Sequence, residues 1–359
     1  MNDMDHMLNQ FRERVLRAAQ DRTPLRMRGG GSKDWYGRPP QGALLDTSGF
    51  SGITSYEPTE LVITARCGTP LREIEAALAS QGQMLAFEPP HFGAGATIGG
   101  VVAGGLAGPR RQAAGAVRDF VLGTTLMDGR GAVLRFGGQV MKNVAGYDVS
   151  RLMAGSLGML GLILEVSLKV LPRPAAECTL CLALEQEEAL RRLNAWAGQP
   201  LPLSASAWHK GMLMVRLSGA QAAVQAAALR MGGDVLNAAA AGAFWRDVRE
   251  QRHAFFAADP AASLWRLALP TVAPALAYGS QQLIEWGGGQ RWLLTDEAPD
   301  RVRALAAERG GHATLYRGPG REGGVFHPLA PAVHAIHRNL KSAFDPAGIF
   351  NPGRMYQDL

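Results

Sequence analysis

Cysteine is scarce in this sequence. Only Cys67, Cys178 and Cys181 occur in 359 residues. A small, odd number of cysteines excludes a disulfide framework and indicates a reducing compartment. Cys178 and Cys181 form a CxxC pair, but no second pair exists, so the chain lacks the four ligands that an iron–sulfur cluster needs. We expect ordinary core cysteines.

Long apolar runs and targeting signals are also lacking. The most apolar long stretch, residues 152–171, contains three glycines, a glutamate and a lysine, which make it a poor membrane span. Residues 1–15 lack the basic-then-apolar pattern of a signal peptide and instead predict an amphipathic helix. We therefore expect a cytoplasmic protein with no membrane span of its own, held at a membrane only through a partner.

Charge is sparse and slightly basic. Charged residues are 19% of the sequence, and 37 basic against 31 acidic residues leave a formal charge of +6. The arginines are scattered and no basic run is interleaved with aromatic residues, so the sequence does not predict nucleic-acid binding. A pyrophosphate or an acidic substrate would suit the same excess. A hydrophobic content of 47% allows a large core in one large domain or in two.

A nicotinamide fingerprint is missing too, since no GxGxxG follows a strand with an acidic residue further on. The sequence has instead RGGGSK at residues 28–33, after strand-like residues. Consecutive glycines expose successive backbone N–H groups and permit positive φ, and such a turn can form a nest for a pyrophosphate. The alternative is a flexible surface turn. The candidate phosphate-binding residues are Arg28, Gly29, Gly30, Gly31, Ser32 and Lys33.

Two later segments are also rich in small residues. In residues 87–100, glycine-containing turns flank Thr97 and would let the backbone press against something flat, although a helix start packed on a sheet is the alternative. In residues 152–163, Gly155, Gly158 and Gly161 make either a loop that wraps a ligand or a buried bend between strands. Together with RGGGSK, these segments indicate a planar cofactor that carries phosphate.

The order of strands and helices predicts two regions. Residues 24–170 alternate short β-rich runs with glycine-rich loops. There we expect a helix with Thr69 as its N-cap and Pro70 as its first residue, and a hairpin turn at residues 128–131. The LPRP segment at 171–174 is the predicted boundary. Beyond it, a β-α-β-β-α order predicts an open sheet backed by helices.

Taken as a set, these segments resemble the FAD-binding domain of the vanillyl-alcohol-oxidase (PCMH) superfamily, in its D-2-hydroxyacid dehydrogenase branch. Within that branch the chain is similar to the FAD-binding accessory subunits of bacterial glycolate-oxidising complexes. The segments that carry the resemblance are RGGGSK (28–33), 62–90, ATIGG (96–100), 117–131, KNVAGYD (142–148), 155–172 and FDPAGIFNPGR (344–354), with LWRLALP (264–270) and EWGGGQRWL (285–293) in the second region.

The resemblance implies an α+β protein that binds one FAD. Residues 1–173 would form a PCMH-type FAD-binding domain of two subdomains, residues 174–335 a smaller, ferredoxin-like α+β cap, and residues 336–359 a tail that returns to the FAD domain. Residues 28–33 would hold the pyrophosphate. The other implied FAD contacts are Ala96, Thr97, Gly99 and Gly100 on the pyrophosphate and ribityl side, Val117, Asp119, Gly161 and Ile163 along the adenosine and flavin portions, and Asn351 from the tail.

The resemblance also implies how the flavin is attached. Family members with covalent FAD often carry a histidine just after the glycine loop, where this chain has Ser32, so non-covalent FAD is expected. The branch's catalytic subunits hold a metal with a His-containing GDGNLH-type motif, which this sequence lacks. His334 and His337 lie three residues apart on an expected helix, but we interpret them as solvated or core-edge residues and predict no metal site.

The implied function is oxidation of a small 2-hydroxy acid, glycolate, to glyoxylate within a complex. Its partners would be a larger FAD-linked catalytic subunit and an iron–sulfur subunit that receives the electrons. Arg266 and Arg291 are the candidates for a carboxylate or partner contact, because arginine binds carboxylates through two parallel hydrogen bonds; salt bridges between cap and FAD domain are the alternative. A self-sufficient oxidase, an FAD-binding scaffold without turnover and a NAD(P)H-dependent reductase are the competing functions.

Overall fold

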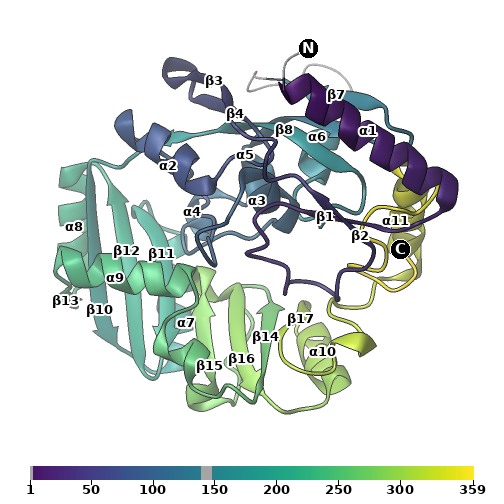
Figure 1. Cartoon of the computed structure of the whole chain (residues 1–359). Helices are drawn as coiled ribbons and strands as arrows, with labels where there is room; N and C mark the ends of the chain where they lie inside the picture. The colour runs from purple at the N-terminus through teal and green to yellow at the C-terminus, as the bar shows by residue number, and fades with distance from the viewer. Residues whose placement is uncertain (1–2, 139–147) are drawn as a thin grey trace.

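The computed structural model describes residues 3–138 and 148–359, so all of the KNVAGYD motif except its last residue lies outside the described residues. Figure 1 shows two layers of structure: the N-terminal half and the C-terminal tail above, and a broad sheet from the second half below. The fold is α+β, as the sequence predicts. Helix α1 (Asp3–Asp21) packs on the upper layer through Phe11, Val15 and Ala18.

The upper layer contains an antiparallel five-stranded sheet in the order β3-β4-β8-β6-β7. Buried Val, Ile and Leu residues run along β4 and β8, two of the strands inside the sheet, and form one core with the helices around them. The strands are β3 (Ile53–Glu57), β4 (Val62–Arg66), β6 (Val121–Met127), β7 (Val133–Gly137) and β8 (Leu162–Lys169), and the helices are α2 (Leu71–Ser80), α3 (Ile98–Gly104), α4 (Arg111–Ala114), α5 (Val117–Phe120) and α6 (Val149–Leu152).

A smaller parallel pair, β1 (Leu25–Arg28) and β2 (Ala43–Asp46), lies beside this sheet and carries the glycine loop at its end. The C-terminal tail joins this pair, since Leu25 bridges Phe350 in parallel. Helix α11 (Pro331–Phe344) precedes the tail. A short antiparallel pair, β5 (Gln83–Met84) with β9 (Leu171–Pro172), closes the upper layer near the chain's passage to the second half.

The lower layer is an antiparallel eight-stranded sheet in the order β13-β10-β12-β11-β15-β16-β14-β17. Its first half runs β-α-β-β-α-β along the chain, which is the ferredoxin-like succession. The elements are β10 (Ala176–Ala183), α7 (Gln186–Ala197), β11 (Leu203–His209), β12 (Met212–Gly219), α8 (Gln221–Met231), β13 (Asp234–Val235), α9 (Ala238–Arg249), β14 (Ser263–Ala268), β15 (Gln282–Glu285), β16 (Gln290–Thr295), α10 (Pro299–Glu308) and β17 (His312–Arg317).

The two faces of the lower sheet have different partners. Helices α7, α8 and α10 cover one face with apolar side chains. The other face packs on loops of the upper layer, where Leu264, Trp292 and Tyr316 from the sheet meet Tyr36 and Leu106. Successive side chains of a strand point to opposite faces of the sheet. The pairing register of the strands therefore determines which ionisable side chains of the lower sheet face the upper layer.

Local predictions fare unevenly against the structure. The hairpin at residues 128–131 is confirmed, and Asp128 holds it by accepting hydrogen bonds from the N–H groups of Arg130 and Ala132, both at 2.9 Å. The N-cap prediction for Thr69 is wrong: Pro70 occupies the cap position. The Thr69 hydroxyl donates instead to the carbonyl of Arg66, the last residue of β4, at 2.7 Å. It is therefore engaged with the end of the strand and does not cap the helix.

Candidate functional site

Two adjoining clefts meet at the end of β1, between the glycine loop and helix α3. Their volumes are about 90 and 100 Å³. They form one continuous groove, since seven lining residues are common to both: Met27, Arg28, Gly29, Gly100, Ala103, Leu157 and Asn351. Segments far apart in sequence thus converge on one groove, and most of the residues predicted to contact FAD line it.

The glycine loop forms the wall of this groove. Among the described residues, none accepts a hydrogen bond from the backbone N–H of Gly29, Gly30, Gly31 or Ser32. Of the three glycines only Gly31 has positive φ, at +73°. Successive unpaired N–H groups around such a residue form an anion-binding nest.

Gly29 and Gly30 must be glycines for a different reason: the glycine loop packs directly against the loop at residues 95–97. A Cβ on Gly30 would lie 1.4 Å from the Gly95 carbonyl oxygen, and one on Gly29 would lie 2.3 Å from Thr97 Oγ1. The sequence interpretation that the three glycines permit positive φ therefore holds for Gly31 alone, while the exposed N–H groups that it expected are found at all three. The other two hold the nest against residues 95–97.

Helix α3 forms the floor of the groove. Gly100, Ala103 and Gly104 fall on one face of the helix and line the cleft. Outside the helix's own backbone, a Cβ on Gly100 would approach only Thr97 Oγ1, at 3.3 Å, so the missing side chain leaves room for something outside the protein. Thr97 is the N-cap and accepts a hydrogen bond from the Gly100 N–H.

Other predicted FAD contacts divide into two groups. Gly99, Gly161 and Ile163 line the cleft nearer to Cys67. Ala96, Val117 and Asp119 are not among the residues that line either cleft: Ala96 is buried, its carbonyl accepting from Leu71 N–H at 2.8 Å. Val117 and Asp119 lie on α5, where Val117 is buried and Asp119 accepts a hydrogen bond from the Ala116 N–H at 2.8 Å.

Asn351 lies where the tail crosses the groove, in the left-handed region with φ of +40°. Its Oδ1 accepts a hydrogen bond from the Met27 N–H at 2.9 Å, and its Nδ2 donates to the Leu157 carbonyl at 2.7 Å. Both ends of the amide thus hold protein segments together. The structure shows that Asn351 positions the groove that it lines, and its contact with the flavin stays a prediction.

Lys33 closes the groove on the side of the lower sheet. Its Nζ lies 3.4 Å from Ser32 Oγ and from the His91 carbonyl oxygen, and 5.7 Å from the centre of the Phe92 ring. Burial lowers the pKa of Lys33 to about 8, against the opposing effect of Glu250. An anion bound in the groove would stabilise the protonated amine and so raise the pKa of Lys33 again.

The chain leads from α3 into a narrow cavity between the two layers. Its volume is about 20 Å³, and Leu106, Arg266, Glu285 and Tyr316 are among its lining residues. The Arg266 guanidinium donates to the Tyr36 hydroxyl at 3.0 Å and lies 5.4 Å from the centre of the Tyr316 ring. A cation held by aromatic rings, with no acidic partner among the described residues, is suited to an anionic substrate.

Register places a carboxyl group on the same face as Arg266. Arg266 pairs with Trp292 across β14 and β16, and Glu285 pairs with Gln290 across β15 and β16. Gln290 and Trp292 are two apart, so all four side chains share the face that meets the upper layer. Glu285 Oε2 accepts from the Trp292 indole at 2.6 Å and from the Gln290 amide at 3.0 Å.

Glu285 is 3% exposed. Burial raises its pKa to about 7, opposed by the hydrogen bonds from Trp292 and Gln290 and reinforced by the nearby charge of Glu88. A carboxyl group with a pKa near neutral pH in the same cavity as a buried arginine is a candidate proton acceptor. The sequence analysis missed it, although EWGGGQRWL was noted, because only the strand register shows where Glu285 points.

Arg291 does not share this site. It pairs with Ile284 and Leu267, on the opposite face from Arg266, and its side chain is fully buried. Its three donor nitrogens bond the carbonyl oxygens of Gly288, Pro274 and Ala273. The prediction that Arg291 contacts a substrate or a partner is therefore wrong, because all three donor nitrogens already bind backbone carbonyls of the cap.

No metal-binding cluster of three or more His, Cys, Asp or Glu occurs among the described residues. His334 and His337 lie on α11 as expected, but His334 pairs with Asp358 at 2.9 Å and His337 with the Val333 carbonyl at 2.8 Å. Within residues 3–138 and 148–359, no helix has the length and apolarity to cross a membrane.

Comparison with known proteins agrees with this geometry. Residues 8–137 match a family model described as an FAD binding domain. The chain is 50% identical to glycolate oxidase subunit GlcE of Escherichia coli (strain K12), over 97% of both chains. It is 31% identical to glycolate oxidase subunit GlcD of Bacillus subtilis (strain 168), over 48% of this chain and 37% of that protein. Alkyldihydroxyacetonephosphate synthase shares the fold, with a TM-score of 0.64 at 15% identity, over 95% of this chain and 73% of the other.

The groove fits the phosphate-bearing part of FAD, because unpaired N–H groups face a floor of glycine and alanine. Fold, groove and family model together define an FAD-dependent flavoprotein of the oxidoreductases that act on CH–OH groups. Within that class, the chain belongs to the family of the glycolate oxidase subunit GlcE.

Proposed function

We propose that this chain is the FAD-binding subunit of a multi-subunit glycolate oxidase. The complex oxidises glycolate to glyoxylate and passes the electrons to an iron–sulfur partner, beside a larger FAD-linked subunit. The likeness to subunit GlcE over nearly the whole chain supports this proposal, as does the partial likeness to subunit GlcD. The observation that carries it is the pairing of an anion nest with a cavity that holds Arg266 and Glu285.

Our proposed domain division is 1–173 for the FAD-binding domain, 174–335 for the cap and 336–359 for the tail. The division fits the sheets, since β9 ends at Pro172 and β10 of the lower sheet begins at Ala176. The tail's bridge from Phe350 to Leu25 also fits.

In the proposed complex with FAD, the residues of the groove have defined tasks. The N–H groups of Gly29–Ser32 and the Lys33 amine bind the pyrophosphate. Gly100 allows close approach along α3, and Gly99 lines the cleft where the helix packs on Cys67. Gly161 and Ile163 line the adenosine end. Ser32 offers no imidazole for a covalent bond to the flavin, so the cofactor is held non-covalently.

Since α3 runs from the nest towards the interlayer cavity, the far end of the bound dinucleotide points to Arg266. When bound there, FAD supplies a two-electron acceptor for the hydride of the substrate carbon. Arg266 binds the substrate carboxylate, and the Glu285 carboxylate takes the hydroxyl proton. The hydride and the proton together account for the loss of two hydrogens from glycolate. The cavity's small volume means that substrate entry requires the cap to move away from residues 106–109.

Reconstitution of the complex tests the proposal. The cavity of the isolated chain stays closed to substrate, so this chain should bind FAD but show no steady turnover of glycolate with an artificial acceptor. The complete complex, in which the cap can move, should turn over and reduce this chain's flavin. Turnover by the single chain would establish the self-sufficient oxidase instead. Flavin in this chain that stays oxidised in the working complex would establish the scaffold, and bleaching by NADPH the reductase.

A further inference from the structure

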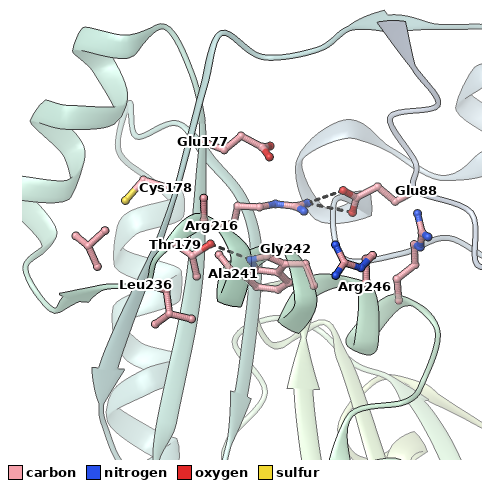
Figure 2. A pocket seen from close by; sticks show the side chains of 13 residues that line it. Glu88, Glu177, Cys178, Thr179, Arg216, Leu236, Ala241, Gly242 and Arg246 are labelled. Atoms are coloured by element: carbon pink, nitrogen blue, oxygen red, sulfur yellow. Dashed lines mark hydrogen bonds and ion pairs between the residues drawn. The ribbon is translucent and has the colours of Figure 1, made fainter. Parts of the chain in front are cut away.

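A separate cavity of about 480 Å³ lies at the side of the lower sheet (Figure 2). It is enclosed by β10, β12, helix α9 and the loop that carries Glu88, and it shares no lining residue with the FAD groove. This volume lies within the range of small-molecule pockets, roughly 300–1,000 Å³. Nothing in the proposed oxidation uses this cavity.

The sequence of α9 keeps the cavity open. The helix turns Ala238, Ala241 and Gly242 towards Cys178 and Thr179 of β10. A Cβ on Gly242 would approach only Arg246 Nη1, at 3.4 Å, so larger side chains would fit there and fill the space. Trp245 forms an aromatic wall, fixed by a 2.9 Å hydrogen bond from its indole N–H to Thr179 Oγ1.

A buried cation lies against this wall. The Arg216 side chain is 7% exposed and its guanidinium lies 5.1 Å from the centre of the Trp245 ring. Nε donates to Ser204 Oγ at 3.1 Å. Nη2 pairs with the Glu88 carboxylate at 2.9 Å (Figure 2). Its Nη1 has no acceptor in the part of the chain that the structure describes, although the side chain lines the cavity.

Positive charge exceeds negative charge around the cavity. The Glu88 carboxylate forms ion pairs with both Arg216 and Arg110. Burial by itself would raise the pKa of Glu88, but the effect of the two arginines is larger, so its pKa is lowered. Arg110 also pairs with Glu177. Arg246 on α9 has no acidic partner among the described residues. An adjoining cavity of about 400 Å³ shares Glu88, Glu177 and Arg249 and adds Glu75, Arg110 and Arg173, so its own charges balance.

We propose that this cavity is a second binding site, for a small organic carboxylate with an apolar or aromatic body. Arg216 Nη1 and the Arg246 guanidinium hold the carboxylate, since guanidinium groups bind carboxylates through paired hydrogen bonds. The body of the ligand packs on Trp245 and Leu236. The unpaired donor selects an anion and the aromatic wall selects an apolar body, so neither inorganic anions nor neutral aromatics satisfy the whole site.

Calorimetric titration of the FAD-loaded full chain with phenylacetate tests this site, with 2-phenylethanol and inorganic phosphate as probes that each lack one feature. Phenylacetate should bind saturably with one site per chain, and the other two at least about tenfold more weakly, a difference of about 1.4 kcal/mol. Absence of saturable phenylacetate binding, or equal affinity for all three probes, would overturn the proposal.

Variants locate the binding. Gly242→Leu fills the cavity, whereas Ala239→Leu adds the same side chain at an exposed position of α9 outside the lining. Arg246→Gln removes the free guanidinium, and Arg252→Gln is its matched control outside the cavity.

Gly242→Leu and Arg246→Gln should each weaken phenylacetate binding at least about tenfold, with the controls unchanged and FAD content equal in all four. Unaltered binding in Arg246→Gln, an exposed position that does not threaten folding, would refute the assignment even if Gly242→Leu failed to fold. Because binding is measured without turnover, its failure leaves the proposed oxidation untouched.

Discussion

The Oδ1 atom of Asn351 accepts a hydrogen bond from the Met27 N–H at 2.9 Å, although 324 residues separate the two. The bond ties the C-terminal tail to the strand that carries the glycine nest. The same amide donates to the Leu157 carbonyl, so one side chain fixes three segments around the groove. Its position explains why the tail matters to a cofactor site formed mainly by the first half of the chain.

Replacing Asn351 should loosen the groove. Asn351→Ala leaves the Met27 N–H and the Leu157 carbonyl, both part-buried, without these partners, at a cost of roughly 1 kcal/mol for each lost hydrogen bond. The melting temperature and the FAD affinity should therefore both fall, as measured by thermal unfolding and flavin titration. Asn351→Asp keeps the acceptor and loses the donor, so it should lie between the two. Wild-type values for Asn351→Ala would contradict the positioning role.

Gly30→Ala should damage FAD binding without any contact to the cofactor. Its Cβ would overlap the Gly95 carbonyl oxygen, so the nest must move away from residues 95–97. We expect FAD affinity to fall at least about tenfold, about 1.4 kcal/mol, in a flavin titration. The control is Gly323→Ala, where a Cβ meets nothing within 4 Å. Equal affinity of the two variants would show that the loop contact does not shape the site.

FAD affinity should depend on pH through Lys33. Burial lowers its pKa from the ordinary 10.5 to about 8, and a bound pyrophosphate would raise it again. Binding then takes up a proton, so affinity is complete below pH 8 and falls as the pH rises through and above that value. Titrations at several pH values should show this fall in the wild type and not in Lys33→Met. A pH-independent wild type would argue against contact between this amine and the phosphate.

Glu285→Gln separates proton transfer from structure. In the complex, the rate of flavin reduction by glycolate should rise as the pH increases through about 7, the pKa that burial gives Glu285. The Gln variant should lose that rise and about 10²–10⁴-fold of the rate. An unchanged rate and pH profile would place the oxidation outside this chain.

Stability supplies a second readout for Glu285. The folded-state pKa is raised above the ordinary 4.5, so its stabilising contribution is complete below pH 4.5 and is lost as the pH rises through 7. Glu285→Gln should therefore melt higher than the wild type above pH 7, with the difference shrinking at lower pH. A difference that does not change with pH would mean that Glu285 does not titrate in the folded chain.

The two arginines should behave differently. Arg266→Lys keeps a charge but loses the planar donor pair, so the KM for glycolate should rise with little change in melting temperature. Arg291→Lys cannot satisfy three backbone carbonyls in their present geometry, so the melting temperature should fall while KM stays near wild type. The reverse pattern would restore Arg291 as the substrate contact.

Local patterns in the sequence located the nest, the α3 floor and the hairpin, because glycine runs and turn residues determine backbone geometry over a few positions. They did not distinguish Gly31 from Gly29 and Gly30, since the contact with residues 95–97 is tertiary. Arg266 and Arg291 look alike in sequence and face opposite sides of one sheet. Glu285 and the Glu88–Arg216 pair depend on strand register and domain packing, which no local signal carries.

The most direct test of the account is the flavin content of the purified chain before and after denaturation. We predict one FAD per chain, released completely into solution when the protein is precipitated with acid, because Ser32 provides no covalent attachment and the nest holds the cofactor through backbone N–H groups and Lys33. A chain that binds no FAD under any loading condition, or flavin that stays with the precipitated protein, would contradict it.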